Sequence, residues 1–415
     1  MEKTKPFIIT KQLVLDAYKL VKMNAGSAGV DQQSIADFEV KLKDNLYKLW
    51  NRMSSGSYFP PPVKAVPIPK KTGGERILGV PTVSDRIAQM IIKIMFEPKV
   101  ESYFHRDSYG YRPNKSALDA IEITRKRCWQ YNWCLEFDIK GLFDNISHQL
   151  LMKAVRKHTD DKLSLLYIER WLKAPMQMPD GGLTERTKGT PQGGVISPIL
   201  SNLFLHYVFD SWMCREYKKV KWCRYADDAL IHCKTEQRAQ LLLINLESRF
   251  KECGLELHPT KTKIIYCKDV NRKKSYPETR FDFLGYTFKP REVLNRKDNK
   301  IFTTFSPAAS DKAIKAMRAK TKEQNFGRRV ELNIEDIARL YNPVLNGWIN
   351  YYGHYNRSSL DKVFRHFNKT LIRWAMRKYI KLTTKTKATK FILQVNKDRP
   401  KLFAHWNIGI IGDVA

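Results

Sequence analysis

The chain contains 415 residues, of which 43% are hydrophobic and 12% aromatic, a composition that excludes an intrinsically disordered protein and suggests two or three domains. Its 74 Lys and Arg residues outnumber its 42 Asp and Glu residues, so the formal charge is +32, and polyanionic partners are expected, nucleic acid ahead of an anionic membrane surface. No apolar run approaches the roughly 18 residues of a spanning helix, and the start MEKTKPFIITK lacks the apolar core of a signal peptide. These features predict a cytoplasmic protein without a membrane partner or a transit peptide.

The first third of the chain predicts helices around one hairpin. Thr10 is expected to cap a helix that leads into the small-residue loop N24-A-G-S-A-G-V-D31. Apolar runs at 63–70 and 76–80 flank K71-T-G-G-E75 and predict a hairpin with cationic shoulders, which Pro67 and Pro69 mark as a sheet edge. Further elements are expected in the following order: helices at about 84–103 and 116–131, a strand at W133-C-L-E-F-D138, and a helix that begins near Asn145.

The last third predicts basic helices. Strand signals fade from about residue 305, so a domain boundary is expected near 300. Asn333 begins a helix whose apolar residues recur at three- and four-residue steps, and Pro343 should kink or interrupt it. Ser359 is expected to begin another helix, in which basic residues recur every four positions: Arg365, Lys369, Arg373 and Arg377.

One acidic pair stands out in this basic chain. Asp227 and Asp228 lie between two short apolar runs in W222-C-R-Y-A-D-D-A-L-I-H232. Aspartates are common in turns, so a plain hairpin tip is one interpretation. If the strand that ends at Asp138 neighbours this hairpin, however, strand spacing of about 4.8 Å brings Asp138 and Asp227 close together. Such carboxylates repel unless they share cations, and oxygen ligands of this kind suit two Mg²⁺ ions that also contact phosphates.

Nine ordered segments resemble a known family. Five of them follow the order of reverse transcriptase palm motifs: W133-C-L-E-F-D-I-K-G-L-F143, G189-T-P-Q-G-G-V-I-S-P-I-L200, Y225-A-D-D228, L255-E-L-H-P-T-K-T262 and F283-L-G-Y-T-F288. Four others are similar to the group II intron-encoded branch: N24-A-G-S-A-G-V-D31, P67-I-P-K-K-T-G-G-E-R-I-L-G-V-P81, S108-Y-G-Y-R-P-N114 and L340-Y-N-P-V-L-N-G-W-I-N-Y-Y-G353. Over roughly residues 10–380 the sequence thus resembles a compact, class C-like reverse transcriptase and maturase without an endonuclease domain.

The resemblance implies an α+β fold, the right-hand polymerase with fingers, an antiparallel-sheet palm and an all-helical thumb. It divides the chain into five parts: an N-terminal extension with a template-lid loop (1–60), fingers that continue into the palm (61–132), the palm (133–300), a helical thumb or X domain (301–380) and a short basic C-terminal extension (381–415). The loop at 24–31 corresponds to the template lid, although a plain interhelix loop has the same composition. The basic tail resembles a DNA-binding extension and equally fits a disordered end.

The same resemblance implies the catalytic residues. Asp138 and Asp227 look like ligands of two Mg²⁺ ions, for which Mn²⁺ can substitute, with the Ile139 carbonyl assisting and Asp228 as the less direct partner. Lys261 resembles the lysine near the leaving pyrophosphate, a plausible general acid. The family commonly has asparagine where His258 stands, which puts the geometry of this loop in doubt.

Other positions match substrate-binding residues of the family. Lys70 and Arg76 correspond to fingertip contacts with the incoming triphosphate, whereas a solvated basic turn is the plain alternative. Phe143 resembles the steric gate that excludes a ribose 2′-hydroxyl, whereas a core phenylalanine is its alternative. Gln192 and Gly193 resemble the loop beneath the nascent base pair, where glycine permits close backbone approach; these residues could instead only shape a turn.

The basic row at Arg365, Lys369, Arg373 and Arg377 is interpreted as a nucleic-acid contact, because its uniform sign differs from the mixed signs of a solvated helix face. The implied partners are an RNA template, a DNA primer, dNTPs, group II intron RNA and target DNA. Three alternatives stay open: a splicing factor without polymerase activity, a host-adopted reverse transcriptase for repair or defence, and an RNA-directed RNA polymerase.

Overall fold

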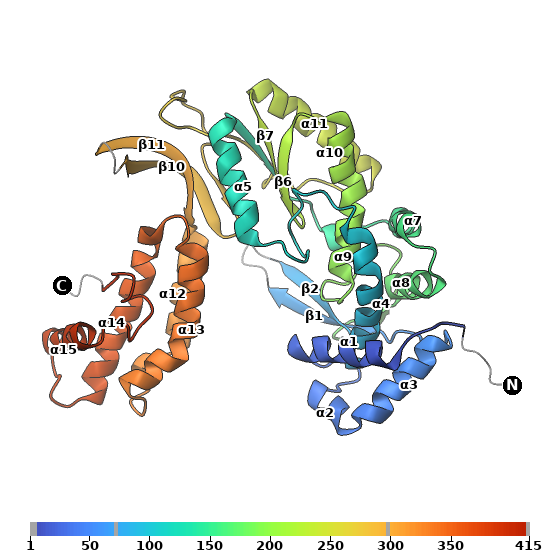
Figure 1. The fold of residues 1–415 in the computed structure, drawn as a ribbon, viewed down its shortest axis with the longest axis horizontal. Helices are drawn as coiled ribbons and strands as arrows, with labels where there is room; N and C mark the ends of the chain where they lie inside the picture. The colour runs from blue at the N-terminus through green and yellow to red at the C-terminus, as the bar shows by residue number, and fades with distance from the viewer. Residues whose placement is uncertain (1–5, 70–73, 296–298, 412–415) are drawn as a thin grey trace. The chain divides into compact units, whose positions relative to one another are not determined.

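The computed structural model describes residues 6–69, 74–295 and 299–411, which form two compact units (Figure 1). The first unit comprises Met1–Ala120 and Leu135–Ile264, and the second comprises Ile121–Cys134 and Ile265–Ala415. The division falls within α5 (Ala117–Gln130), β3 (Trp133–Phe137) and β8 (Lys263–Tyr266). The five-part division implied by the family resemblance stays a prediction.

The helices of the first unit begin largely where side-chain caps allow. The Thr10 hydroxyl accepts the Leu13 amide at 3.1 Å, which confirms the predicted start of α1. The helix expected near Asn145 is displaced: α6 ends there, and α7 begins only after Ser147, whose hydroxyl accepts the Leu150 amide. The helices of this unit are α1 (Lys11–Met23), α2 (Ile35–Val40), α3 (Leu42–Ser54), α4 (Val83–Glu101), α6 (Leu142–Asn145), α7 (His148–His158), α8 (Lys162–Lys173), α9 (Ser197–Leu205), the π-helical turn η1 (His206–Asp210), α10 (Ser211–Glu216) and α11 (Glu236–Glu252).

The predicted hairpin is present as β1 (Val63–Pro69) and β2 (Glu75–Val80), which pair antiparallel. They belong to a sheet of order β2-β1-β4-β5 with β4 (Met176–Gln177) and β5 (Leu183–Thr184). The hairpin lies at one end of this sheet, as predicted, because β2 is an edge strand, although β1, which carries the prolines, lies between β2 and β4. Only Val63 and Lys64 pair with β4, however, so Pro67 and Pro69 lie beyond that pairing, and their missing amides remove no bond to β4.

A second sheet, of order β6-β7-β3-β8, contains β6 (Lys221–Tyr225) and β7 (Asp228–Cys233) as an antiparallel hairpin. The strand predicted at 133–138 is therefore confirmed, as is its position beside the hairpin. Phe137 at the end of β3 packs edge-on against Phe209 and Phe250, with ring centroids 5.3 and 5.7 Å apart. Phe250 lies on α11, which Figure 1 shows beside β7. This aromatic core fixes the end of β3 just before Asp138.

The second unit contains a sheet of order β11-β10-β9 and a group of helices (Figure 1). The helix expected from Asn333 is confirmed with a capping box to Asp336, but it continues through Pro343 without interruption. The helix expected from Ser359 begins at Asp361, because a 3₁₀ turn occupies Arg357–Leu360. The elements are β9 (Phe281–Phe283), β10 (Tyr286–Asn295), β11 (Lys300–Ala309), α12 (Asp311–Glu323), η2 (Phe326–Arg328), α13 (Ile334–Tyr352), η3 (Arg357–Leu360), α14 (Asp361–Lys378) and α15 (Lys385–Asp398).

The basic tail folds against the second unit, so the alternative of a disordered end is wrong for the described residues up to 411. Ala388 and Ile392 of α15 are buried in the helical core. Farther along, His405 is fully buried and bonds Asn368 of α14 through its Nε2 at 2.6 Å, and the Asn368 amide donates to the Ile411 carbonyl. Burial lowers the pKa of His405 to about 3, so this histidine is neutral at physiological pH. Within the described residues, no helix is long and apolar enough to cross a bilayer.

Candidate active site

Three carboxylates meet where two neighbouring strands of the β6-β7-β3-β8 sheet end. Asp138 directly follows β3, while Asp228 begins β7 and pairs with Tyr225 of β6. Ala226 and Asp227 therefore form a two-residue hairpin turn, in which Ala226 has a φ of 57°. A left-handed first residue is the geometry that joins tightly twisted strands, although alanine adopts it at some cost. The hairpin-tip interpretation of the acidic pair is correct as local structure, and the tip lies beside Asp138's strand.

The backbone before Asp227 is held by a buried arginine that sequence reasoning missed. Arg224 is 1% exposed and forms a bidentate ion pair with Asp210 at 2.8 and 2.6 Å. Its Nη1 also donates to the Ala226 carbonyl at 3.1 Å and to Asn202 at 3.0 Å. A basic residue inside an apolar strand was the available signal, because a buried charge requires a partner. Arg224 therefore fixes the turn through the residue that precedes Asp227.

The segment S108-Y-G-Y111 lies along the other side of the turn. Tyr109 donates its amide to the Arg224 carbonyl at 2.8 Å, and the Gly110 carbonyl accepts from Asn202 at 2.7 Å. A Cβ at Gly110 would lie 2.4 Å from the Ala226 nitrogen, so only glycine fits there. This motif thus packs against the backbone of the hairpin turn that carries Asp227.

The electrostatics show that the three carboxylates affect one another. Burial, followed by the charges of Asp227 and Asp138, raises the pKa of Asp228 to about 7, although solvent on its exposed side moderates the effect. Burial and the charge of Asp138 also raise the pKa of Asp227, and the cations Arg76 and Lys261 offset part of this rise. The protein therefore gathers negative charge here without fully neutralising it.

This donor set fits a divalent metal, which carboxylate and carbonyl oxygens bind well. Among the described residues, no group of three or more His, Cys, Asp or Glu side chains is placed to hold a metal ion. Mg²⁺ typically uses one or two protein carboxylates and takes its remaining ligands from phosphates and water. Asp138 and Asp227 thus fit an ion whose coordination a phosphorylated substrate completes.

The loop of the L255-E-L-H-P-T-K-T262 motif packs against Asp138. The Lys261 ammonium forms an ion pair with the Asp138 carboxylate, and the His258 amide donates to the Asp138 carbonyl at 2.8 Å. This bond uses the backbone of residue 258, so the departure from the family's asparagine leaves it intact. The Lys140 amide also donates to the Glu256 carbonyl, so a backbone hydrogen bond lies on each side of Ile139. The Ile139 carbonyl itself takes part in neither of these two bonds. The roles of Lys261 and Ile139 stay predictions.

The substrate-binding predictions fall partly beside this site. The Arg76 guanidinium bonds the Gln192 side chain, and the Gln192 carbonyl accepts the Gly79 amide at 2.8 Å. Gly193 has a φ of 124°, and a Cβ there would lie 2.5 Å from the Gly79 carbonyl, so the loop requires glycine. Because the charge of Arg76 lowers the pKa of Asp227, these groups share one region. Lys70 lies outside the described residues.

Phe143 is the second residue of α6, the short helix that follows Asp138. Its side chain is 9% exposed within α6, and its carbonyl accepts the Thr190 amide at 2.7 Å. A Cβ at Gly189 would lie 2.7 Å from the same carbonyl, so the two motif loops pack backbone to backbone. A largely buried ring with a small exposed edge suits both the gate and the core interpretation, and the gate stays a prediction.

Helix α4 contributes three buried polar residues that sequence reasoning missed. The Gln89 side-chain oxygen accepts the Val195 amide at 2.8 Å and the Ile196 amide at 3.3 Å, and its nitrogen donates to Asp85 at 2.9 Å. Arg86 donates to the Ala25 and Ser27 carbonyls at 3.0 and 2.9 Å, which ties the loop at 24–31 to this helix. The available signal was the presence of Asp85, Arg86 and Gln89 among the apolar residues of the first half of this helix.

The predicted nucleic-acid contacts lie on α14 of the second unit, and all four are exposed. Arg377 also donates to the Gly327 carbonyl at 2.8 Å, so it contributes to the packing of η2. The opposite face of α14 is buried through Phe364, Phe367 and Trp374. The helix therefore presents basic side chains on one face, and their function stays a prediction.

Comparisons with known proteins agree with these motifs. A family model described as "Reverse transcriptase (RNA-dependent DNA polymerase)" matches residues 68–288, just over half of the chain. A second model, "Group II intron, maturase-specific domain", matches residues 314–392.

The matches to individual relatives cover different shares of this chain and of the relatives themselves. Protein YkfC of Escherichia coli is 33% identical, over 60% of this chain and 75% of that protein. The group II intron-encoded protein LtrA of Lactococcus lactis is also 33% identical, but the match covers 48% of this chain and only a third of LtrA. An uncharacterized 91 kDa protein in a cob intron of Schizosaccharomyces pombe is 25% identical, over 84% of this chain and half of that protein.

Among solved structures, a telomerase from Candida albicans in complex with a fragment of telomeric RNA is similar with a TM-score of 0.46 at 14% identity, over 89% of this chain and 70% of that one. The family assignment rests on the sequence models and on YkfC rather than on this structural similarity. The chain belongs to the reverse transcriptases, the RNA-directed DNA polymerases, and within them to the group II intron-encoded type that carries a maturase domain.

Proposed function

We propose that this chain copies RNA into DNA at the carboxylate cluster formed by Asp138, Asp227 and Asp228, with two Mg²⁺ ions, and that Mn²⁺ can substitute for them. The observation that carries the proposal is the adjacency of β3 and β7, which brings carboxylates from two distant motifs within mutual electrostatic reach. Divalent ions held there would supply charge stabilisation for the attacking and leaving oxygens of a phosphoryl transfer.

The neighbouring residues have separate roles in this proposal. Asp138 and Asp227 bind the ions, with Asp228 and the Ile139 carbonyl as weaker ligands. Arg76 and Lys70 attract the triphosphate of a dNTP, and Arg76 already bonds Gln192 of the loop beneath the nascent base pair. Lys261, now paired with Asp138, exchanges that partner for the leaving pyrophosphate and gives it a proton. Phe143 excludes the 2′-hydroxyl.

The second part of the proposal concerns partners. An RNA template and a DNA primer occupy the polymerase, and target DNA serves as a source of primer. Group II intron RNA is a further ligand, whose splicing the chain assists. The match of residues 314–392 to the maturase domain supports this splicing role, and so does the exposed basic row of α14.

The test is extension of a DNA primer on a long RNA template by Asp227→Asn. This variant keeps the size of the side chain but removes its charge, so we expect synthesis to fall by at least about a thousandfold, the equivalent of several kcal/mol of lost transition-state stabilisation. Intron RNA binding and splicing assistance should be retained. The matched control is Asp160→Asn, an exposed carboxylate in the turn before α8, which should extend like the wild type. Full extension by Asp227→Asn would refute the site assignment.

A further inference from the structure

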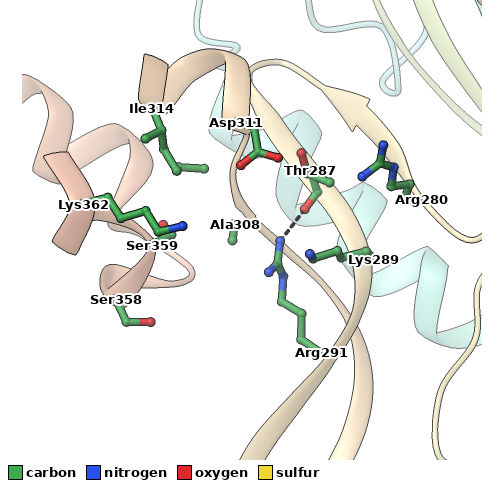
Figure 2. Close-up of a pocket in the computed structure, with 11 residues that line it drawn as sticks. Arg280, Thr287, Lys289, Arg291, Ala308, Asp311, Ile314, Ser358, Ser359 and Lys362 are labelled. Atoms are coloured by element: carbon green, nitrogen blue, oxygen red, sulfur yellow. Dashed lines mark hydrogen bonds between the residues drawn. The ribbon is translucent and has the colours of Figure 1, made fainter. Parts of the chain in front are cut away.

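A small cavity in the second unit gathers basic side chains (Figure 2). It has a volume of about 160 Å³ and lies between strands β10 and β11 on one side and the starts of α12 and α14 on the other. Its charged lining consists of four basic residues and one acid, and we call these five the anion pocket: Arg280, Lys289, Arg291, Lys362 and Asp311. Figure 2 shows Lys289 and Arg291 of β10, together with Arg280 just before β9, on one side and Lys362 on the other.

Strand geometry places the cations of the sheet together. Lys289 and Arg291 lie two positions apart on β10, so their side chains point to the same face of the sheet. Tyr286 and Phe288 point to the other face and are fully buried. Phe288 pairs with Phe281 of β9, and Arg280 directly precedes that strand, so Arg280 and Lys289 lie at the same end of the β9–β10 pairing and both line the cavity. Like charges held close together repel each other. A bound anion would relieve this repulsion.

Arg291 is held in place without being neutralised. Its Nε and Nη2 donate to the Ser306 and Thr287 carbonyls at 3.2 and 3.1 Å, and Figure 2 marks the bond to Thr287. Both acceptors are uncharged. Burial lowers the pKa of this guanidinium, and the charge of Asp311 offsets part of that effect. The protein therefore keeps a half-buried cation whose direction is fixed before any ligand arrives.

The basic row of α14 continues from the pocket. Lys362 is followed by Arg365, Lys369 and Arg373 at steps of three or four residues, which lie on one face of a helix, and all four are exposed. A free small anion would need the pocket alone. A polynucleotide backbone would use both the pocket and the row, since it carries phosphates at regular intervals.

We propose that the anion pocket binds one phosphodiester group of a polynucleotide that continues along α14. This inference rests on the proposed function for the presence of nucleic acid, but it assigns a defined binding site where the sequence predicted only a basic helix face. Arginine and lysine side chains from different elements converge on one tetrahedral group, because neither the strand nor the helix alone supplies enough donors.

The test is a double-mutant cycle on Arg280→Gln and Lys362→Gln, with the affinity for an RNA–DNA duplex measured by fluorescence anisotropy at several salt concentrations. Each single variant should weaken binding by about five- to tenfold at ~0.1 M salt and lower the slope of log K against log salt by about 0.7–0.9, the effect of one phosphate contact. The double variant should be little weaker than either single one, because both residues serve the same phosphate.

Lys320→Gln and Lys397→Gln form the control pair, since both are exposed on other helices and do not line the pocket. Any losses in this pair should simply add. Additive losses in the Arg280 and Lys362 cycle, or no loss, would overturn the inference. The inference would also be overturned if the variants bound the duplex as tightly as the wild type while only the wild type bound inorganic phosphate tightly. The pocket would then be a site for a free anion. The control variants Lys320→Gln and Lys397→Gln lie outside the pocket and keep Asp227, so they should extend a primer–template like the wild type, whereas Asp227→Asn should still bind the duplex; the two tests can therefore fail separately.

Discussion

At the scale of single residues, the buried Arg224 holds the turn that presents Asp227. It is fully buried, its guanidinium faces the buried carboxylate of Asp210, and it also holds the carbonyl of Ala226 in the turn that presents Asp227. Removing one partner from a buried ion pair leaves the other charge without compensation, which costs far more than the pair itself contributes. The catalytic turn therefore depends on a residue that contacts no substrate in the proposed mechanism.

We predict that Arg224→Met lowers the free energy of unfolding of the first unit by about 3–5 kcal/mol in urea denaturation, because Asp210 then stays buried without its cation. Adding Asp210→Leu should restore a large part of this loss. The control, Arg215→Met, removes an exposed arginine paired with Glu216 on α10 and should cost less than about 1 kcal/mol. Equal, small losses for both arginine variants would contradict the account.

At this scale, the sequence predicted those features that an unusual charge marks, such as acidic residues in a basic chain. The proximity of Asp138 to Asp227 and Asp228 could be predicted, because Asp138 follows one strand, the acidic pair lies at a hairpin tip, and neighbouring strands are closely spaced. The roles of Arg224 and Gln89 could not be predicted, because an arginine inside an apolar strand or a glutamine in an apolar stretch of helix indicates a buried polar group but not the groups that it contacts. For Phe143, neither the sequence nor the exposed fraction of 9% decides between a gate and a core residue, because both observations suit either role.

At the scale of elements, α4 supports one loop of the proposed active site. Gln89 accepts two amides of the loop that contains Gln192 and Gly193, and it is itself held by Asp85, which also accepts from Tyr58 and Trp171 at 2.9 and 2.7 Å. Burial raises the pKa of Asp85 to about 6 despite these donors. Such a connected and buried network fixes one loop conformation.

We predict that Gln89→Leu raises the KM for dNTPs by about tenfold, the equivalent of one or two lost hydrogen bonds, with a smaller change in kcat. Leucine has a similar volume but cannot accept the Val195 and Ile196 amides, so the loop beneath the nascent base pair should lose its order. Steady-state kinetics on an RNA template would measure this, with Gln240→Leu on the exposed face of α11 as the control. A lower melting temperature with an unchanged KM would show that Gln89 only supports the fold.

Periodicity and caps predicted most elements but not their boundaries. The starts of α1 and α13 were correct because Thr10 and Asn333 carry their own capping hydrogen bonds. The start of α14 was two residues early, because an intervening 3₁₀ turn has no distinct pattern. Pro343 did not interrupt α13, and the internal position of β1 depended on β4, a strand of two residues with no sequence signal. Tertiary pairing decided these cases.

At the scale of the whole molecule, the charge of +32 and the carboxylate cluster act in opposite ways. In the proposed account, basic side chains on α14 and in the anion pocket would attract a polyanion, whereas the cluster at Asp138 and Asp227 would repel it unless cations intervene. A basic chain that concentrates acid where phosphate must react therefore requires metal ions at that point. This requirement is the central claim of the account.

The most direct measurement is the number of Mn²⁺ ions bound per chain, counted by electron paramagnetic resonance in the complex with primer–template and a non-hydrolysable dNTP analogue. We predict about two ions for the wild type and for the Asp160→Asn control, because two ions serve one phosphoryl transfer. Asp138→Asn and Asp227→Asn should each lose at least one ion while still binding the primer–template. Two tightly bound ions in both aspartate variants would contradict the claim that these carboxylates hold the metals.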